Sequence, residues 1–190
     1  MEKHDVWRTP IWVIPPAVEF EKQLKSLTKI IKAKKNLANK DSNISIRNGW
    51  RIDDPHKLKE LSILKDYIMW TTIKCFNDTG YNYKNKQLGF TSWLNVHDKM
   101  GYNNVHHHGA SLLSGVLYIN CPEGSGKIHL RDPRPVASMN KLLPDCNRNF
   151  IFEPKAGSTI LFPGFLEHFV EPSIADEDDP RIAVAFNVNE

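Results

Sequence analysis

The chain has 190 residues, of which 41% are hydrophobic and 25% are charged, as expected of one globular domain that buries its own core. Its formal net charge of +3 argues against a dominant nucleic-acid or membrane surface. The longest apolar runs are far shorter than the roughly 20 residues of a membrane helix, and no apolar signal-peptide stretch follows the polar N-terminus.

The N-terminal part predicts an extended leader and a helix. Residues 1–16 are rich in Pro and Trp, which predicts an extended segment packed on the domain as an edge strand; such a leader could also pair with a second copy in a homodimer. Over about 17–35, apolar side chains recur at helical spacing and lysines fill the other face, which predicts an amphipathic helix. These apolar positions are Phe20, Leu24, Leu27 and Ile31.

A polar segment and a second helix follow. Residues 36–50 predict turns. The second helix is predicted over about 55–76, with Pro55 in its first turn and Asp54 as its cap, and residues 77–80 end it. Its expected buried stripe consists of Leu58, Leu61, Leu64, Ile68 and Ile73.

From about residue 88 the sequence changes to short apolar or alternating runs broken by Gly, Pro and Asn. These runs predict strands near 88–96, 112–120, 127–131, 149–153, 158–162, 165–171 and 181–188. Two helices followed by seven strands indicate a mostly-β fold, a double-stranded β-helix (jelly roll) braced by the helices. We expect a single domain over 1–190, with leader and helices in 1–87 and the jelly-roll core in 88–190. The acidic stretch 176–179 predicts a solvated loop.

The three cysteines, Cys75, Cys121 and Cys146, lie far apart along the chain. Their number is odd and no Cys-x-x-Cys pair occurs, which argues against a disulfide framework and against a thiolate zinc site. We therefore expect a reducing compartment.

Histidines form the most informative pattern. His106 and His108 are two residues apart just before a predicted strand, and His168 lies on a later one. Extended residues i and i+2 point to the same face, so His106 and His108 can face one metal while His107 points away. With His168 they would fill one face of an octahedron and leave the opposite positions open, as at non-haem iron sites. Imidazole also suits zinc, copper and nickel.

Simpler interpretations stand beside this one. Three consecutive histidines also occur in solvated loops, and His168 taken singly could be a buried structural residue. His97 and His129 are expected to be ordinary strand or loop residues.

Arg181 opens the last predicted strand, and its guanidinium could pair with a carboxylate in bidentate fashion. On that strand it shares a face with Ala183, Ala185 and Asn187. Small residues beside an arginine and an asparagine favour a pocket wall over a packed core. The alternative is a surface arginine that balances the acidic stretch before it.

Several motifs occur in a characteristic order: Thr9-Pro10-Ile11, Trp93-Leu94-Asn95, His106-x-His108, Ser114 to Tyr118, Asp132-Pro133-Arg134, Phe162-Pro163 with His168, and Arg181 through Asn187. Together they resemble the small 2-oxoglutarate/iron(II) oxygenases of marine bacteria and their phages, which are related to prolyl hydroxylases. The resemblance covers nearly the whole chain. It implies a cytoplasmic enzyme, in the host cell if a phage encodes it.

The resemblance implies iron(II) bound by His106, His108 and His168, with O2 and the co-substrate 2-oxoglutarate completing the reaction. The keto-acid end of 2-oxoglutarate would chelate the iron, and its far carboxylate would pair with Arg181. Tyr118 matches a strand tyrosine that helps to hold this carboxylate in prolyl hydroxylases; a packed strand aromatic is an equal alternative.

Further positions follow from the same resemblance. Asn95 falls near another co-substrate contact, and Asp132 and Arg134 either order a loop or touch the substrate. The broader superfamily has His-x-Asp where this chain has His106-x-His108, so three neutral imidazoles would leave the site at +2 rather than +1. Glu167 is not expected to replace the missing carboxylate, because it neighbours His168 and should face the other way in a strand.

Two other functions remain open at this point. A cupin-like metalloenzyme also uses His-x-His and a late histidine, although a glutamate usually follows the pair and none does here. A jelly roll that binds metal without catalysis is the second. For an oxygenase the substrate is a peptidyl side chain, by the relation to prolyl hydroxylases, or else a small metabolite or a modified nucleobase.

Overall fold

The computed structural model describes the chain except residues 3–5, 7, 40–44, 137–138, 140–148 and 177. The elements in order are β1 (Trp12–Ile14), α1 (Val18–Glu21), α2 (Leu24–Lys32), the 3-10 helix η1 (Lys35–Leu37), β2 (Ile46–Asp53), η2 (Pro55–Lys57), η3 (Lys59–Leu61), α3 (Ile63–Thr79), β3 (Gly89–His106), β4 (Leu113–Asn120), β5 (Ile128–Leu130), β6 (Phe150–Phe152), β7 (Thr159–Phe162), β8 (His168–Val170) and β9 (Arg181–Asn189).

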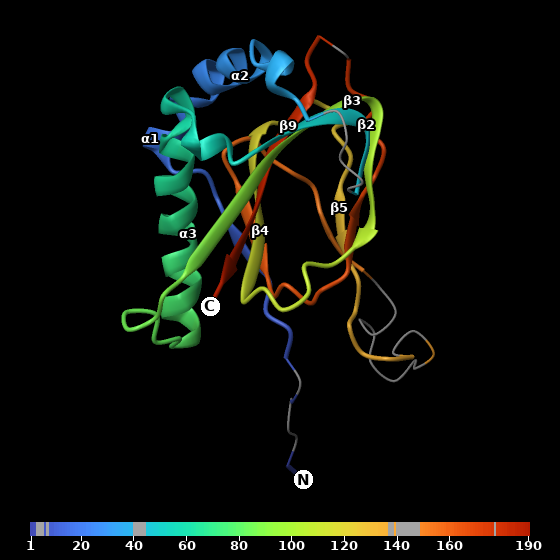
Figure 1. The fold of residues 1–190 in the computed structure, drawn as a ribbon. Coiled ribbons are helices and arrows are strands. Elements are labelled where there is room, and N and C mark those ends of the chain that lie inside the picture. Colours follow the sequence, from blue (N-terminus) through green and yellow to red (C-terminus); the bar gives the residue numbers. More distant parts are fainter. Residues whose placement is uncertain (3–5, 7, 40–44, 137–138, 140–148, 177) are drawn as a thin grey trace.

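All strand pairs are antiparallel, and the strands follow the order β1-β7-β4-β9-β3-β8-β5-β6, with β2 added beside β3. This sheet curls into the predicted jelly roll (Figure 1). The long strand β3 joins the two halves of the roll, because residues 89–97 pair with β9 while Asn103 and His106 pair with β8.

A glycine permits the bend in β3. A Cβ atom at Gly101 would lie 2.3 Å from the carbonyl oxygen of Asn48 and 2.8 Å from Cβ of His97. Neighbouring Met100 has a positive φ of 61°, which is uncommon for a residue with a side chain. The strand therefore turns tightly against β2 at this point, and only a residue without a side chain fits there.

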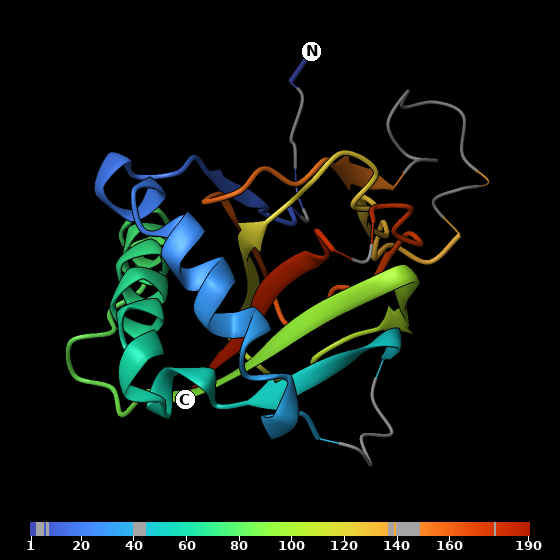
Figure 2. The same cartoon turned by 90° about the horizontal axis from the view of Figure 1, so that it is seen from above.

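The helices cover one face of the sheet, as seen from above in Figure 2. Their buried side chains pack against the outer side of β3, β4 and β9 in one core. A second, smaller core fills the inside of the roll and consists of Tyr118, Ile128, Leu130, Ile160, Phe162, Leu166, Val170 and Ala183. The main sheet is thus buried on both faces, which holds the inward-facing residues of β3 and β9 in fixed positions.

The N-terminal predictions are confirmed in part. β1 is an edge strand on β7, and Phe20, Leu24, Leu27 and Ile31 are buried, although the helix predicted over 17–35 is divided into α1, α2 and η1. Trp7 of the leader lies outside the described residues.

The prediction of turns over 36–50 is wrong at its end, because β2 begins at Ile46. The pair Asn48-Gly49 resembles a turn in the sequence but is an irregularity within the strand, where the register with β3 shifts.

The second helix also begins later than predicted. Leu58 has an extended backbone, so residues 55–61 form two 3-10 turns and α3 starts at Ile63. Asp54 has a left-handed backbone and makes no side-chain capping bond, so its predicted capping role is wrong. Leu61, Leu64 and Ile68 are buried as predicted.

Among the described residues, no helix is long and apolar enough to cross a membrane. Cys75 and Cys121 are free thiols, and Cys146 lies outside the described residues.

Candidate metal centre and co-substrate pocket

Three imidazoles converge inside the mouth of the roll. His106 is the last residue of β3, His168 is its cross-strand partner on β8, and His108 lies two residues beyond β3. Each presents a ring nitrogen, and these three atoms all lie within 4.8 Å of one another. His107 is exposed, and its Nδ1 accepts the backbone N–H of Gly109. His106 and His108 thus meet although the strand ends between them.

Backbone carbonyls set the tautomers of two of these rings. Nδ1 of His106 lies 2.7 Å from the carbonyl oxygen of Asn104, and Nδ1 of His168 lies 2.9 Å from that of Leu166. A carbonyl oxygen only accepts, so both Nδ1 atoms carry the proton. The Nε2 lone pairs are left for a metal, as is usual at histidine metal sites.

An asparagine orients the third ring. Nδ1 of His108 lies 3.3 Å from the side-chain nitrogen of Asn187, whose oxygen accepts the hydroxyl of Ser114 at 2.7 Å. When Nε2 of His108 binds a metal, Nδ1 carries the proton and needs an acceptor. A rotation of the Asn187 amide by a half turn supplies its oxygen, and the amide nitrogen then donates to Ser114.

The environment keeps all three imidazoles neutral. Burial lowers the pKa of His168 to about 3 and that of His108 to about 4, and it also lowers the pKa of His106. The mutual repulsion of the rings adds to this effect for His108 and His168. Neutral imidazole is the form that binds a metal. Nε2 of His108 and Nε2 of His168 lie 3.3 Å apart, close to the spacing of about 3 Å for two adjacent ligands at about 2.1 Å from one ion.

Arg181 lines the same narrow cavity as the three histidines, together with Asn95, Ala183 and Ala185. It is only 2% exposed, and no acidic group among the described residues pairs with it. Its Nη1 donates to Nδ1 of His97 at 3.0 Å, while its Nε atom has no partner. A buried guanidinium without a counter-ion is costly, so this site favours an anionic ligand.

The other predicted co-substrate contacts lie close to Arg181. Asn95 is buried, and its side-chain oxygen has no hydrogen-bond partner. The Tyr118 ring centroid is 5.3 Å from the guanidinium carbon, and its hydroxyl is also without a partner. Tyr118 packs in the inner core, and burial raises the pKa of its phenol. Unpaired buried polar atoms gathered around one cation are the pattern expected of a binding site for a polar group.

Sequence reasoning missed the contribution of His97. It is 1% exposed and binds Arg181, yet it was expected to be an ordinary residue. The signal was the alternation of β3, because Asn95 and His97 share a face, but the predicted strand ended at residue 96. Trp93 belongs to the Trp93-Leu94-Asn95 motif, and its ring lies 5.4 Å from that of His108.

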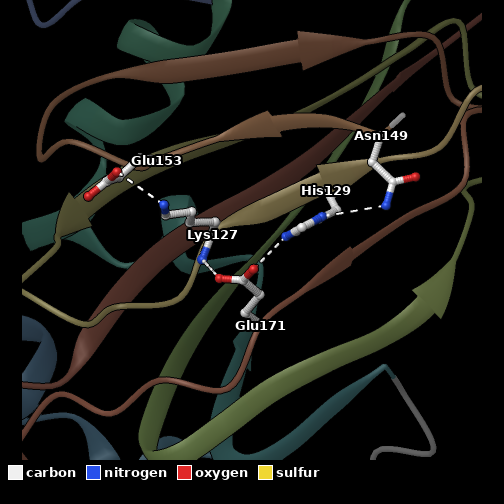
Figure 3. Close-up of polar contacts among 5 residues, drawn as sticks. All are labelled: Lys127, His129, Asn149, Glu153 and Glu171. Carbon is white, nitrogen blue, oxygen red and sulfur yellow. Dashed lines mark hydrogen bonds and ion pairs between the residues drawn. The ribbon is translucent and has the colours of Figure 1, made fainter. Parts of the chain in front are cut away.

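The remaining candidates lie away from the three histidines. Nε2 of His129 donates to Glu171 at 2.6 Å on the outer face of β5, and Asn149 and Lys127 belong to the same polar group (Figure 3). Glu167 pairs with Arg131 at 3.1 Å and is half exposed.

The Asp132-Pro133-Arg134 motif contains an ion pair between its first and last residues. Asp132 and Arg134 form a bidentate ion pair with each other, and Arg134 lowers the pKa of the Asp132 carboxyl. The pair joins two residues of the segment that follows β5.

Comparisons with known structures agree with the fold. A prolyl-4-hydroxylase of Pseudomonas putida is similar with a TM-score of 0.67 at 14% identity, covering 96% of this chain and 93% of the other. A Trichoplax adhaerens prolyl hydroxylase, in complex with a peptide from hypoxia inducible factor, is similar with a TM-score of 0.68 at 13% identity. The match covers 94% of this chain and 83% of the other. HygX of Streptomyces hygroscopicus, with nickel and 2-oxoglutarate bound, is similar with a TM-score of 0.64 at 12% identity. The match covers 95% of this chain and 83% of the other.

Sequence comparison identifies the family. No curated protein matches the sequence. The profile of the family described as "Putative 2OG-Fe(II) oxygenase" matches residues 91–187, which is just over half of the chain and includes all three clustered histidines and Arg181. The chain therefore belongs to the 2OG-Fe(II) oxygenases, enzymes that depend on iron(II) and 2-oxoglutarate.

Proposed function

We propose that His106, His108 and His168 bind the iron(II) of this enzyme, and that Arg181 binds the far carboxylate of 2-oxoglutarate. The observation that carries the proposal is the buried Arg181 guanidinium, which lines one cavity with the three histidines and has no acidic partner among the described residues. A dicarboxylate with one end at the metal would supply the missing negative charge.

The protein residues prepare this site for both groups. The carbonyls of Asn104 and Leu166 hold two imidazoles in the ligating tautomer. Ala183 and Ala185 leave space along β9 beside Arg181. Iron(II) and 2-oxoglutarate, when bound, supply the oxidising chemistry, in which O2 is consumed and 2-oxoglutarate becomes succinate and carbon dioxide.

We further propose that the reaction is hydroxylation of a peptidyl side chain, within one catalytic domain over 1–190. The row of cross-strand partners His106, His168, Leu130 and Phe150 runs across the sheet. Phe150 therefore lies on the metal-facing side, and it is 43% exposed. Phe165, in the turn before β8, is 55% exposed. These aromatics suit a peptide at the mouth, and the Trichoplax relative was solved with a peptide bound.

The test is succinate formation by the iron-loaded protein. We expect formation to require iron(II) and O2 and to fall to background in Arg181→Met. Peptides that serve as substrates would gain one oxygen atom in mass spectrometry, only when 2-oxoglutarate is present. Iron binding without any O2-dependent consumption of 2-oxoglutarate would contradict the proposal and favour a metal-binding module.

A further inference from the structure

We propose that His97 is a positioning residue that holds the Arg181 guanidinium ready for the co-substrate carboxylate while leaving its positive charge uncompensated. This inference rests on the proposed binding of 2-oxoglutarate at Arg181. It concerns a histidine outside the metal cluster, on the strand that pairs with β9.

The contact is built into the sheet. His97 on β3 is the direct cross-strand partner of Arg181 on β9. Nη1 of Arg181 lies 3.0 Å from Nδ1 of His97, and Nε2 of His97 lies 2.8 Å from the side-chain oxygen of Asn103. The side-chain nitrogen of Asn103 donates to the hydroxyl of Ser45 at 2.9 Å. The chain of contacts runs from Arg181 through His97 and Asn103 to Ser45.

The chemistry of these groups fixes the direction of each bond. A guanidinium only donates, so Nδ1 of His97 accepts and the ring proton resides on Nε2. That proton is donated to Asn103, whose amide then donates to Ser45. Because each group has one role, the imidazole cannot turn over without breaking two buried hydrogen bonds. The guanidinium is thereby restrained before any ligand arrives.

His97 is suited to position Arg181 because its imidazole is neutral. Burial lowers its pKa to about 3, and the adjacent Arg181 contributes to this lowering. The ring is therefore uncharged at neutral pH. A carboxylate at this position would restrain Arg181 equally well, but it would also neutralise the guanidinium and remove the attraction for an incoming carboxylate. A neutral acceptor holds the guanidinium of Arg181 in place without cancelling its positive charge.

Four substitutions separate these effects. His97→Asn places an amide oxygen near the Nδ1 position and keeps a neutral acceptor. His97→Asp has the same shape but adds a negative charge. His97→Leu removes the acceptor, and Arg181→Met removes the guanidinium itself. Thermal melting and circular dichroism select the variants that fold.

Binding is measured by calorimetry on Ni(II)-loaded protein, with 2-oxoglutarate and with 2-oxobutanoate, which keeps the keto-acid end but lacks the far carboxylate. We expect 2-oxoglutarate to bind at least about tenfold more weakly to His97→Leu and to His97→Asp, and His97→Asn to stay within about threefold of the parent. Binding of 2-oxobutanoate should stay within about twofold in all variants.

The outcomes distinguish the two proposals. If Arg181→Met weakens 2-oxoglutarate binding while His97→Leu and His97→Asp leave it unchanged, the role of His97 is refuted and the proposed site stands. If Arg181→Met also has no effect, the proposed site itself fails. Equal losses for both keto acids would show general damage to the metal end and would refute positioning.

A second measurement needs no variant. In ¹⁵N NMR of the unmodified protein, Nδ1 of His97 should have the chemical shift of an unprotonated ring nitrogen at neutral pH. A protonated Nδ1 would overturn the assigned contact with Arg181.

Discussion

Nε2 of His108 and Nε2 of His168 lie 3.3 Å apart although the two residues are separated by 60 positions in the sequence. Nε2 of His168 has a free lone pair because its Nδ1 donates to the carbonyl of Leu166, so Nε2 of His108 must either donate a proton to it or share a cation with it. Since burial keeps the pKa of both rings far below neutrality, the pair is poised for a metal ion.

The first prediction concerns metal binding. His106→Ala or His168→Ala should weaken iron(II) binding by more than about 100-fold, because loss of even an indirect partner of a metal site typically costs 10- to 100-fold. Metal titration measures this, with His107→Ala and His129→Ala as matched histidine controls. Equal weakening in the controls would argue against a site at the three clustered histidines.

The second prediction concerns Asn187. Asn187→Leu removes the group that orients His108, so iron(II) affinity should fall by about 10- to 100-fold. The free energy of unfolding without metal should fall by only about 1 to 3 kcal/mol, because the buried Ser114 hydroxyl loses its acceptor. Asn189→Leu, two residues further along β9, provides the control. An unchanged affinity in Asn187→Leu would show that His108 needs no such partner.

The third prediction concerns the missing carboxylate. His108→Asp should still bind iron(II), because Asp is a metal ligand, but the added negative charge should lower the iron reduction potential and weaken 2-oxoglutarate binding. Voltammetry and calorimetry measure the two effects. If the potential were the same in the variant and the parent, residue 108 would not be bound to the metal.

The fourth prediction concerns acid stability. The pKa of His97 is about 3 in the folded protein against an ordinary value of 6.5, so between these values the unfolded chain binds the proton and the folded chain does not. The free energy of unfolding should therefore decrease as pH falls below about 6.5, by about 1.4 kcal/mol per pH unit from this residue. Urea denaturation of metal-free protein between about pH 7 and pH 4 measures the slope.

His97→Asn should reduce that slope, and His107→Asn, at an exposed position, should not. Because His108 and His168 also have lowered pKa values, part of the slope should persist in His97→Asn. A slope identical to that of the parent would show that His97 is protonated as readily in the folded state as in the unfolded one.

The C-terminal half of the fold was predictable from the sequence because its strands are short apolar or alternating runs broken by Gly, Pro and Asn. The run from Arg181 to Val188 is an example: β9 begins at Arg181, and Arg181, Ala183 and Ala185 line one cavity. The N-terminal half was harder. Asn48-Gly49 has the composition of a turn, and the extended Leu58 has no sequence signal that distinguishes it from a helical residue.

The approach of His106 and His108, with His107 pointing away, followed from the i and i+2 rule. The rule held although His108 lies two residues beyond the end of β3, whereas the meeting with His168 depends on the pairing of β3 with β8, which local patterns do not encode. His97 was missed because polar residues after it hide the continuation of β3. The bend at Gly101 depends on contact with β2, which is a tertiary relationship that local patterns do not encode.

The bent strand β3 has a consequence for chain-length discrimination. It includes His106 and also His97, which contacts Arg181, so in the proposed binding mode one strand carries a group at each end of the keto acid. A fixed distance between these two groups would select keto acids by their chain length. We expect oxaloacetate, one methylene shorter than 2-oxoglutarate, and 2-oxoadipate, one methylene longer, to compete poorly, because neither has the length to contact the three histidines and Arg181 together.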